Sequence, residues 1–156
     1  MDVVDRILAR IHEAPLLYYR LVLLVGPSGS GKTKALQAVS ECVAAPLINV
    51  NLELARCLLE VDVQRRPLEV QKILQDIVDK IEGDLVLLDN LEMLFEVQLQ
   101  QDPLRLLQRL SRNKAIVAAW NGSLENDRIT YASPDHPEYR NYPIRDVLVV
   151  SVEANN

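Results

Sequence analysis

The sequence predicts an α/β domain in which helices flank a parallel sheet. Short aliphatic runs alternate along the chain with segments whose apolar residues recur at helical spacing, an order typical of parallel sheets. Hydrophobic residues make up 49% of the 156 residues and aromatic residues only 4%, so aliphatic side chains must build the core, as they do in sheets buried on both faces. A glycine-rich loop at residues 26–33 also lies between an aliphatic run and a helical segment.

Length and charge limit what the chain can be. Its 156 residues suffice for one domain with a buried core but not for two, so we expect residues 1–156 to form a single domain. The net charge of -5 argues against a strong standing affinity of the whole surface for DNA. The sequence has no signal peptide and no apolar stretch that predicts a membrane span. We therefore expect a cytoplasmic protein with no membrane partner.

The first part of the chain predicts a flanking helix and the first strands. Residues 1–14 have apolar residues at helical spacing, with Asp2 as a possible cap and Pro15 as the end of the helix. The aliphatic run that follows predicts a buried strand at residues 21–25. The same criteria then predict a helix that ends at Pro46, a strand at residues 47–50 and a short helix at residues 52–59.

The second part repeats this alternation. A long apolar stripe over residues 70–81 predicts a helix that Gly83 ends. Residues 122–143 combine Gly122 and three prolines with many polar residues, and they predict a long polar loop. The remaining elements are a strand at residues 85–89, a helix that starts at Asp102 and Pro103, a strand at residues 115–120 and a last strand at residues 147–152.

The loop at residues 26–33 has the sequence GPSGSGKT, which is the spacing of a phosphate-binding loop. Its glycines tolerate positive φ and let backbone N–H groups turn inward, and the next helix presents its N-terminus to the anion. Lys32 can reach the outer two phosphates, and Thr33 can bind the accompanying Mg²⁺. The sequence thus predicts a nucleoside triphosphate site. Its binding residues are Gly26, Pro27, Ser28, Gly29, Ser30, Gly31, Lys32, Thr33 and Lys34.

The strand at residues 85–89 ends in Asp89, a second candidate ligand for Mg²⁺. In phosphate-loop enzymes an aspartate in this place holds the cation, and the ends of parallel strands gather such groups at one edge of the sheet. A simple turn cap is the alternative. An acid that orients the attacking water often follows this aspartate, but here Asn90 follows, with Glu92 two residues further on. Asn90 is therefore a candidate catalytic position that puts hydrolysis in doubt.

Asn121 ends the strand at residues 115–120 and precedes Gly122. It can contact the γ-phosphate or the attacking water, or it can be a turn residue, because Asn-Gly is a common turn pair. With this third feature the chain resembles the AAA-type branch of the ASCE class of phosphate-loop (P-loop) ATPases, in which a polar sensor residue lies here. The resemblance implies a five-stranded parallel sheet with the Asn121 strand between the other two motif strands. It also implies ATP as the ligand, although no feature of the sequence excludes GTP.

The chain also departs from the AAA pattern. It stops at Asn156, soon after the predicted last strand, so we expect no C-terminal helical lid. Three segments, GPSGSGKT, LVLLDNLEMLF and PEYRNYP, are similar to those of the BrxF family, small P-loop proteins of type III bacteriophage-exclusion (BREX) systems. Membership of that family would imply an antiphage role beside other BREX proteins.

Arginines are candidates for a cation supplied across a subunit boundary in a homo-oligomer, as phosphoryl transfer often requires. Arg105, Arg109 and Arg112 recur at helical spacing, and Arg140 lies in the predicted polar loop. For each one, a solvated surface position is the plainer interpretation.

The residues leave three functions open. The first is an ATP-binding switch or weak ATPase, which the loop, Asp89 and Asn121 favour. The second is a small nucleotide kinase of guanylate-kinase type, whose loop is similar to GPSGSGKT. The third is an interaction module that keeps the nucleotide as a structural ligand, which Asn90 favours.

Overall fold

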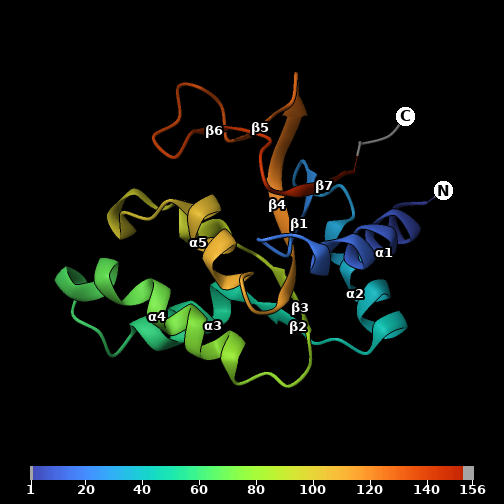
Figure 1. The fold of residues 1–156 in the computed structure, drawn as a ribbon. Helices are drawn as coiled ribbons and strands as arrows, with labels where there is room; N and C mark the ends of the chain where they lie inside the picture. Colours follow the sequence, from blue (N-terminus) through green and yellow to red (C-terminus); the bar gives the residue numbers. More distant parts are fainter. Residues whose placement is uncertain (1, 153–156) are drawn as a thin grey trace.

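A computed structural model describes residues 2–152 of the chain. Five parallel strands form its centre, in the spatial order β2, β3, β4, β1 and β7 (Figure 1). As the AAA resemblance implies, β4 lies between β1 and β3. The structure confirms the α/β class that the sequence predicts. The strands are β1 (Leu21–Gly26), β2 (Leu47–Asn49), β3 (Leu85–Asp89), β4 (Ala115–Glu125) and β7 (Leu148–Ser151).

Helices cover both faces of this sheet (Figure 1). Val22 and Leu24 of β1 pack on the side of α1 and α2, whereas Leu21 and Leu23 pack on the side of α3, α4 and α5, because successive strand side chains point to opposite faces. Burial on both faces explains why β1 is an unbroken aliphatic run. The helices are α1 (Val3–Glu13), α2 (Lys32–Val43), α3 (Val50–Leu58), α4 (Arg66–Asp79) and α5 (Pro103–Leu110).

Polar side chains fix where several helices begin. The carboxylate of Asp2 accepts a hydrogen bond from the Asp5 N–H at 2.9 Å, and that of Asp102 accepts one from the Arg105 N–H at 3.3 Å, so both predicted starts are confirmed. Asn49 caps α3 in the same way. For this reason β2 ends at Asn49, and Val50, which the sequence pattern predicts as strand, begins the helix instead.

Short 3₁₀ helices complete the chain between these elements. They are η1 (Ala14–Leu16), η2 (Val63–Arg65), η3 (Glu92–Phe95) and η4 (Val97–Leu99).

The prediction of a long polar loop over residues 122–143 is wrong for most of that segment. β4 continues to Glu125 and pairs antiparallel with β5 (Arg128–Tyr131), which in turn pairs with β6 (Arg140–Pro143). The turn between β4 and β5 has Asn126 at φ 50° and Asp127 at φ 59°, the backbone of a two-residue hairpin turn, which these residue types tolerate. Only the connection over residues 132–139 lacks regular structure.

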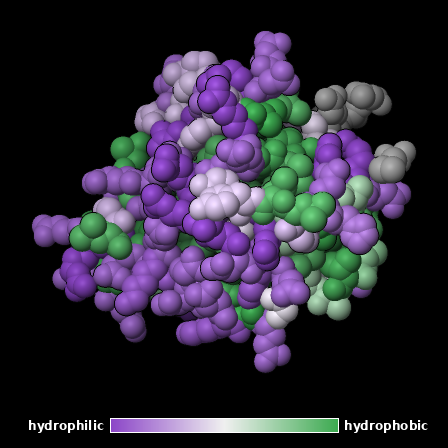
Figure 2. Space-filling view, in the orientation of Figure 1, coloured by the Kyte–Doolittle hydropathy of each residue, from purple (hydrophilic) through white to green (hydrophobic). Residues whose placement is uncertain are grey.

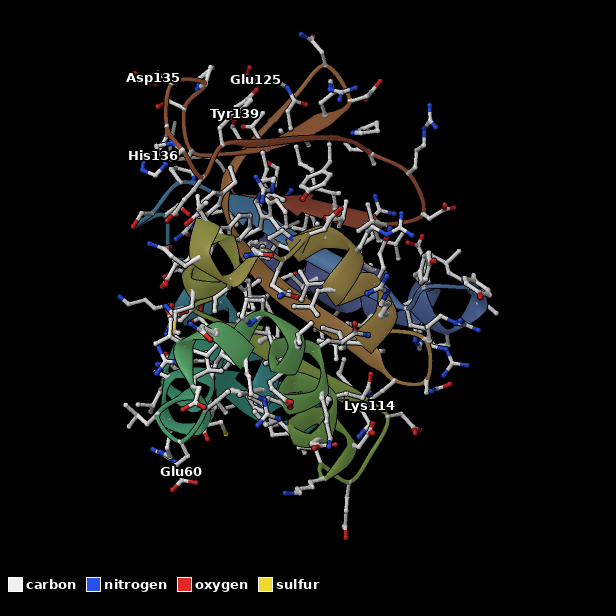
Figure 3. The ribbon with its side chains drawn as sticks, turned by 90° about the vertical axis from the view of Figure 1, so that its left-hand side faces the viewer. Glu60, Lys114, Glu125, Asp135, His136 and Tyr139 are labelled. Carbon is white, nitrogen blue, oxygen red and sulfur yellow. The ribbon has the colours of Figure 1, made fainter. Side chains whose placement is uncertain are left out.

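An aromatic cluster fastens this hairpin to the sheet. Tyr131 stacks on Phe95 with ring centroids 3.5 Å apart, and buried Trp120 meets Phe95 and Tyr142 edge-on. The Tyr142 hydroxyl also donates a hydrogen bond to Asp102 at 2.8 Å. Figure 3 shows Asp135, His136 and Tyr139 on the β5–β6 connection, at the opposite end of the molecule from Lys114.

We expect Gly122→Ala to destabilise the hairpin. Gly122 is paired with Tyr131 where β4 leaves the parallel sheet, and a Cβ there would lie 1.7 Å from the carbonyl oxygen of Thr130. Relieving this overlap means moving paired backbone, so the free energy of unfolding should fall by about 1–3 kcal/mol, the usual cost of overpacking. Thermal unfolding measures this, with Glu125→Ala at the exposed end of β4 as the control. Equal melting temperatures of Gly122→Ala and wild type would contradict the hairpin geometry.

Two further expectations concern a C-terminal helical lid and a membrane-spanning helix. Residues 153–156 lie outside the described residues, and so does the region in which the sequence predicts no helical lid. Within residues 2–152, no helix combines the length and the apolar character that crossing a membrane requires.

Candidate functional site

The loop between β1 and α2 is shaped by its glycines. Gly29 and Gly31 have φ of 79° and 92°, values that favour glycine because other residues are strained there. Gly26 is needed for a different reason from the one predicted, since a Cβ there would lie 2.7 Å from the Ser30 hydroxyl oxygen and 2.7 Å from the Val152 carbonyl oxygen. Gly31 precedes α2 and no side chain caps that helix, so the first amides of α2 are free to bind an anion.

Lys32 is held against this loop. Its side chain is 6% exposed, and its Nζ donates hydrogen bonds to the carbonyl oxygens of Gly26 at 2.9 Å and Pro27 at 2.6 Å, with the Ser30 hydroxyl at 3.3 Å. Burial lowers the pKa of Lys32 from its usual value, while the negative charges of Asp89 and Glu92 act in the opposite direction. The three hydrogen-bond acceptors are all neutral, and a phosphate oxygen would be a stronger acceptor for this ammonium group.

Thr33 and Asp89, the two predicted Mg²⁺ ligands, lie in contact. The Thr33 hydroxyl donates a hydrogen bond to Asp89 Oδ2 at 2.6 Å, and the other carboxylate oxygen accepts one from the Asn90 N–H at 2.9 Å. Mg²⁺ in nucleotide sites takes one or two protein oxygens and fills its shell with phosphate oxygens and water. A hydroxyl and a carboxylate side by side fit this requirement. Residues 2–152 contain no cluster of three or more His, Cys, Asp or Glu side chains that would form an all-protein metal site.

One pocket of about 420 Å³ brings the three sequence motifs together. It opens where β1 and β3 end. Asn121 does not end its strand, because β4 continues to Glu125, but in the register of the sheet it is paired with Gly26, the last residue of β1. Two predicted binding residues, Gly26 and Pro27, line a separate neighbouring pocket, and Ser30 contacts Lys32. The main pocket is lined by Ser28, Gly29, Gly31, Lys32, Thr33, Lys34, Asp89, Asn90, Glu92, Ala119 and Asn121.

Glu92 is a pocket residue that the sequence analysis does not select. It lines the pocket together with Asp89 and Asn121, although it stands three positions after Asp89. The chain turns sharply between them, because Asn90 has a φ of 56° in the left-handed region. Asn is one of the few residues that adopt this conformation readily, so Asn90 is compatible with the turn, although the residue type alone does not specify it.

Among residues 2–152, no arginine lines the main pocket. Arg109 donates a hydrogen bond to the Gln71 side chain at 2.9 Å, and the Arg112 guanidinium lies 4.1 Å from the centre of the Tyr18 ring. Arg140 donates to the carbonyl oxygen of Gln101 at 3.3 Å. Three of the arginines considered in the sequence analysis therefore have other contacts within the chain.

Comparison with known proteins agrees with this geometry. A family model described as "ATPase family associated with various cellular activities (AAA)" matches residues 22–120, which is more than half of the chain. The matched segment starts in β1, includes the phosphate-binding loop and Asp89, and ends one residue before Asn121. A search of the curated proteins found no match.

Proposed function

The chain belongs to the family of ATPases associated with various cellular activities, and we propose from this premise that it is an ATP-binding switch with weak or partner-activated, Mg²⁺-dependent ATPase activity. The observation that carries the proposal is the shared pocket, which the phosphate-binding loop, Asp89 and Asn121 line together. A simple glycine turn with a surface lysine would not leave the lysine 6% exposed beside a buried aspartate.

Each residue has a distinct role in this proposal. The loop amides and Lys32 bind the phosphates, and the Thr33 hydroxyl and the Asp89 carboxylate hold Mg²⁺. The cation, when bound, supplies positive charge to the phosphate oxygens. The Asn121 side chain donates a hydrogen bond to the γ-phosphate or to the attacking water. The backbone N–H of Asn90 fixes the orientation of the Asp89 carboxylate through their 2.9 Å hydrogen bond.

We propose low activity for the chain alone because the described pocket has no arginine. Phosphoryl transfer concentrates negative charge on the transferred group, and a second cation commonly stabilises it. A subunit or partner that brings an arginine to the pocket would complete the site. Turnover would then depend on assembly, as expected of a nucleotide switch.

The role of the switch is proposed from the BrxF resemblance. GPSGSGKT, LVLLDNLEMLF and PEYRNYP support a cytoplasmic antiphage function beside other BREX proteins. An exposed apolar surface supports partner binding: Leu16 and Tyr18, which follow α1, are 88% and 65% exposed. Figure 2 shows hydrophobic residues gathered over α1 and β7, whereas hydrophilic residues cover most of the side formed by α3, α4 and α5.

Asp89→Asn should weaken nucleotide binding mainly when Mg²⁺ is present. The substitution removes the charged ligand of the cation but keeps the shape of the side chain, so binding without Mg²⁺ should change little. We expect a loss of about tenfold or more in affinity for Mg-ATP, as for other groups that support a metal site. Calorimetric titration with ATP, in Mg²⁺ and in EDTA, measures both values. Asp84→Asn, just before the other end of β3, is the matched control, and equal losses in both buffers would mean that Asp89 is only a turn cap.

A coupled assay separates the proposed function from its alternatives. ATP turnover that occurs without any nucleoside monophosphate supports an ATPase. Turnover that requires an added monophosphate, with formation of the diphosphate, would instead identify a kinase. Tight ATP binding without turnover at any protein concentration or with any BREX protein added would identify the interaction module.

A further inference from the structure

We propose that Glu92 is the base that orients and deprotonates the attacking water, in place of an acid at position 90. The inference rests on the proposed ATPase function and assigns one further residue to it. Its starting point is the pocket, in which the described lining residues include two carboxylates, those of Asp89 and Glu92.

The backbone explains how an acid two residues further along reaches the pocket. β3 ends at Asp89, and Asn90 then adopts a φ of 56°. This left-handed residue ends the extended backbone of the strand, and the 3₁₀ helix η3 begins two residues later, at Glu92. A glutamate at position 90 would be strained by the same φ, because Asn enters this region more readily than Glu. The same turn therefore explains both why Asn stands at position 90 and why the acid stands at position 92.

Contacts on both sides hold the segment that carries Glu92. The backbone N–H of Asn51 donates to the carbonyl oxygen of Asn90 at 2.9 Å, and the Asn51 side-chain oxygen accepts a hydrogen bond from the Met93 N–H at 2.9 Å. At the other end of η3, Phe95 is buried between Trp120 and Tyr131. Groups that act in catalysis need such support, because small errors in position cost much of the rate.

The two carboxylates cannot exchange roles. Asp89 is 6% exposed, and its oxygens are already used by the Thr33 hydroxyl and the Asn90 N–H. No hydrogen bond of this kind occupies the side chain of Glu92 among residues 2–152, and Glu92 lines the same pocket. Glu92 is therefore the carboxylate that can accept a proton.

The step that we assign to Glu92 is the attack on the γ-phosphorus. The water oxygen forms a bond to the γ-phosphorus while the bond from that atom to the β,γ-bridging oxygen breaks, and the bridging oxygen takes the electron pair and leaves with ADP. The proton lost by the water passes to the Glu92 carboxylate and then to solvent. ATP and water thus give ADP, inorganic phosphate and a proton.

The test is Glu92→Gln in the full chain, with Glu96→Gln as the matched control. Glu96 is four residues away and lines a different groove, together with Leu59 and Met93. General-base catalysis contributes about 10²–10⁴-fold, so Glu92→Gln should lower kcat at least about 100-fold while ATP binding persists, and Glu96→Gln should leave kcat unchanged. If wild type turns over ATP and Glu92→Gln does so at the same rate, the inference is overturned while the proposed function stands.

A second measurement decides the inference if turnover is too slow to follow. Removing a negative charge beside the γ-phosphate should raise affinity for ATP more than affinity for ADP, by about threefold or more. Calorimetry of both ligands with wild type, Glu92→Gln and Glu96→Gln gives this ratio. A ratio that Glu92→Gln leaves unchanged would overturn the assignment of Glu92. A wild-type chain that binds neither nucleotide would instead refute the proposed function itself.

Discussion

Lys32→Ala is expected to lower the affinity for ATP by at least about 100-fold and to leave the domain folded. Hydrogen bonds that involve a charged group contribute roughly 1.5–3 kcal/mol each, and Lys32 can offer more than one to the phosphates. Its partners in the structure are Gly26, at the end of β1, and Pro27 and Ser30 in the loop. Because none of these belongs to the interior of the sheet, the substitution removes binding energy without opening the core.

Calorimetry with ATP and Mg²⁺ measures this loss. Lys72→Ala, an exposed lysine of α4, is the matched control and should bind as wild type does. Thermal unfolding of both variants separates loss of binding from loss of structure. A folded Lys32→Ala protein with undiminished affinity for ATP would contradict the assignment of the phosphate-binding loop.

Most of the central sheet could be predicted because its strands are buried on both faces. β1 and β3 are runs of aliphatic residues, and such runs have few other stable arrangements in a chain of this length. The loop at residues 26–33 was equally predictable, since its residue types each meet a separate requirement for binding phosphate. Helix starts at Asp2 and Asp102 followed from capping, which is a local effect.

The hairpin could not be predicted as readily because its signals are weaker. β5 has one buried residue, Ile129, among polar neighbours, and the nearby Pro134 and Pro137 are typical of loops. Its stability comes from contacts distant in sequence, above all the stacking of Tyr131 on Phe95. The place of Glu92 depends similarly on the left-handed backbone of Asn90. A strand-end motif alone does not specify that conformation.

The isolated chain is expected to hydrolyse ATP slowly, and its turnover per subunit should rise when subunits or a partner close over the pocket. An arginine supplied across a boundary raises the rate of related phosphoryl transfers by roughly 10³–10⁵-fold. Among residues 2–152 no arginine lines the pocket. The loss of rate from a missing arginine is by itself large enough to make a correctly folded site look inactive.

An exposed arginine without contacts in its own chain is the better candidate to reach the pocket of a neighbouring subunit, because no contact is lost when its side chain moves. Arg109 and Arg112 already contact Gln71 and Tyr18, so a role in a neighbouring pocket would cost these contacts. Arg105 and Arg145 are exposed and can be tested first. Arg140 is a third candidate, although it donates a hydrogen bond to Gln101.

Mixing two inactive variants tests the idea directly. A Lys32→Ala subunit cannot bind ATP but can still donate its arginine, whereas a subunit that lacks the donor arginine can bind ATP but cannot complete a neighbour. Neither variant alone should turn over ATP, and their mixture should recover a fraction of the wild-type rate for one arginine and not for the others. A partner protein as the donor would leave every such mixture inactive but would accelerate wild type when added. A high turnover rate that does not vary with protein concentration, from a chain shown to be monomeric, would rule out both a neighbouring subunit and a partner protein as the donor. The site would then be complete within one subunit.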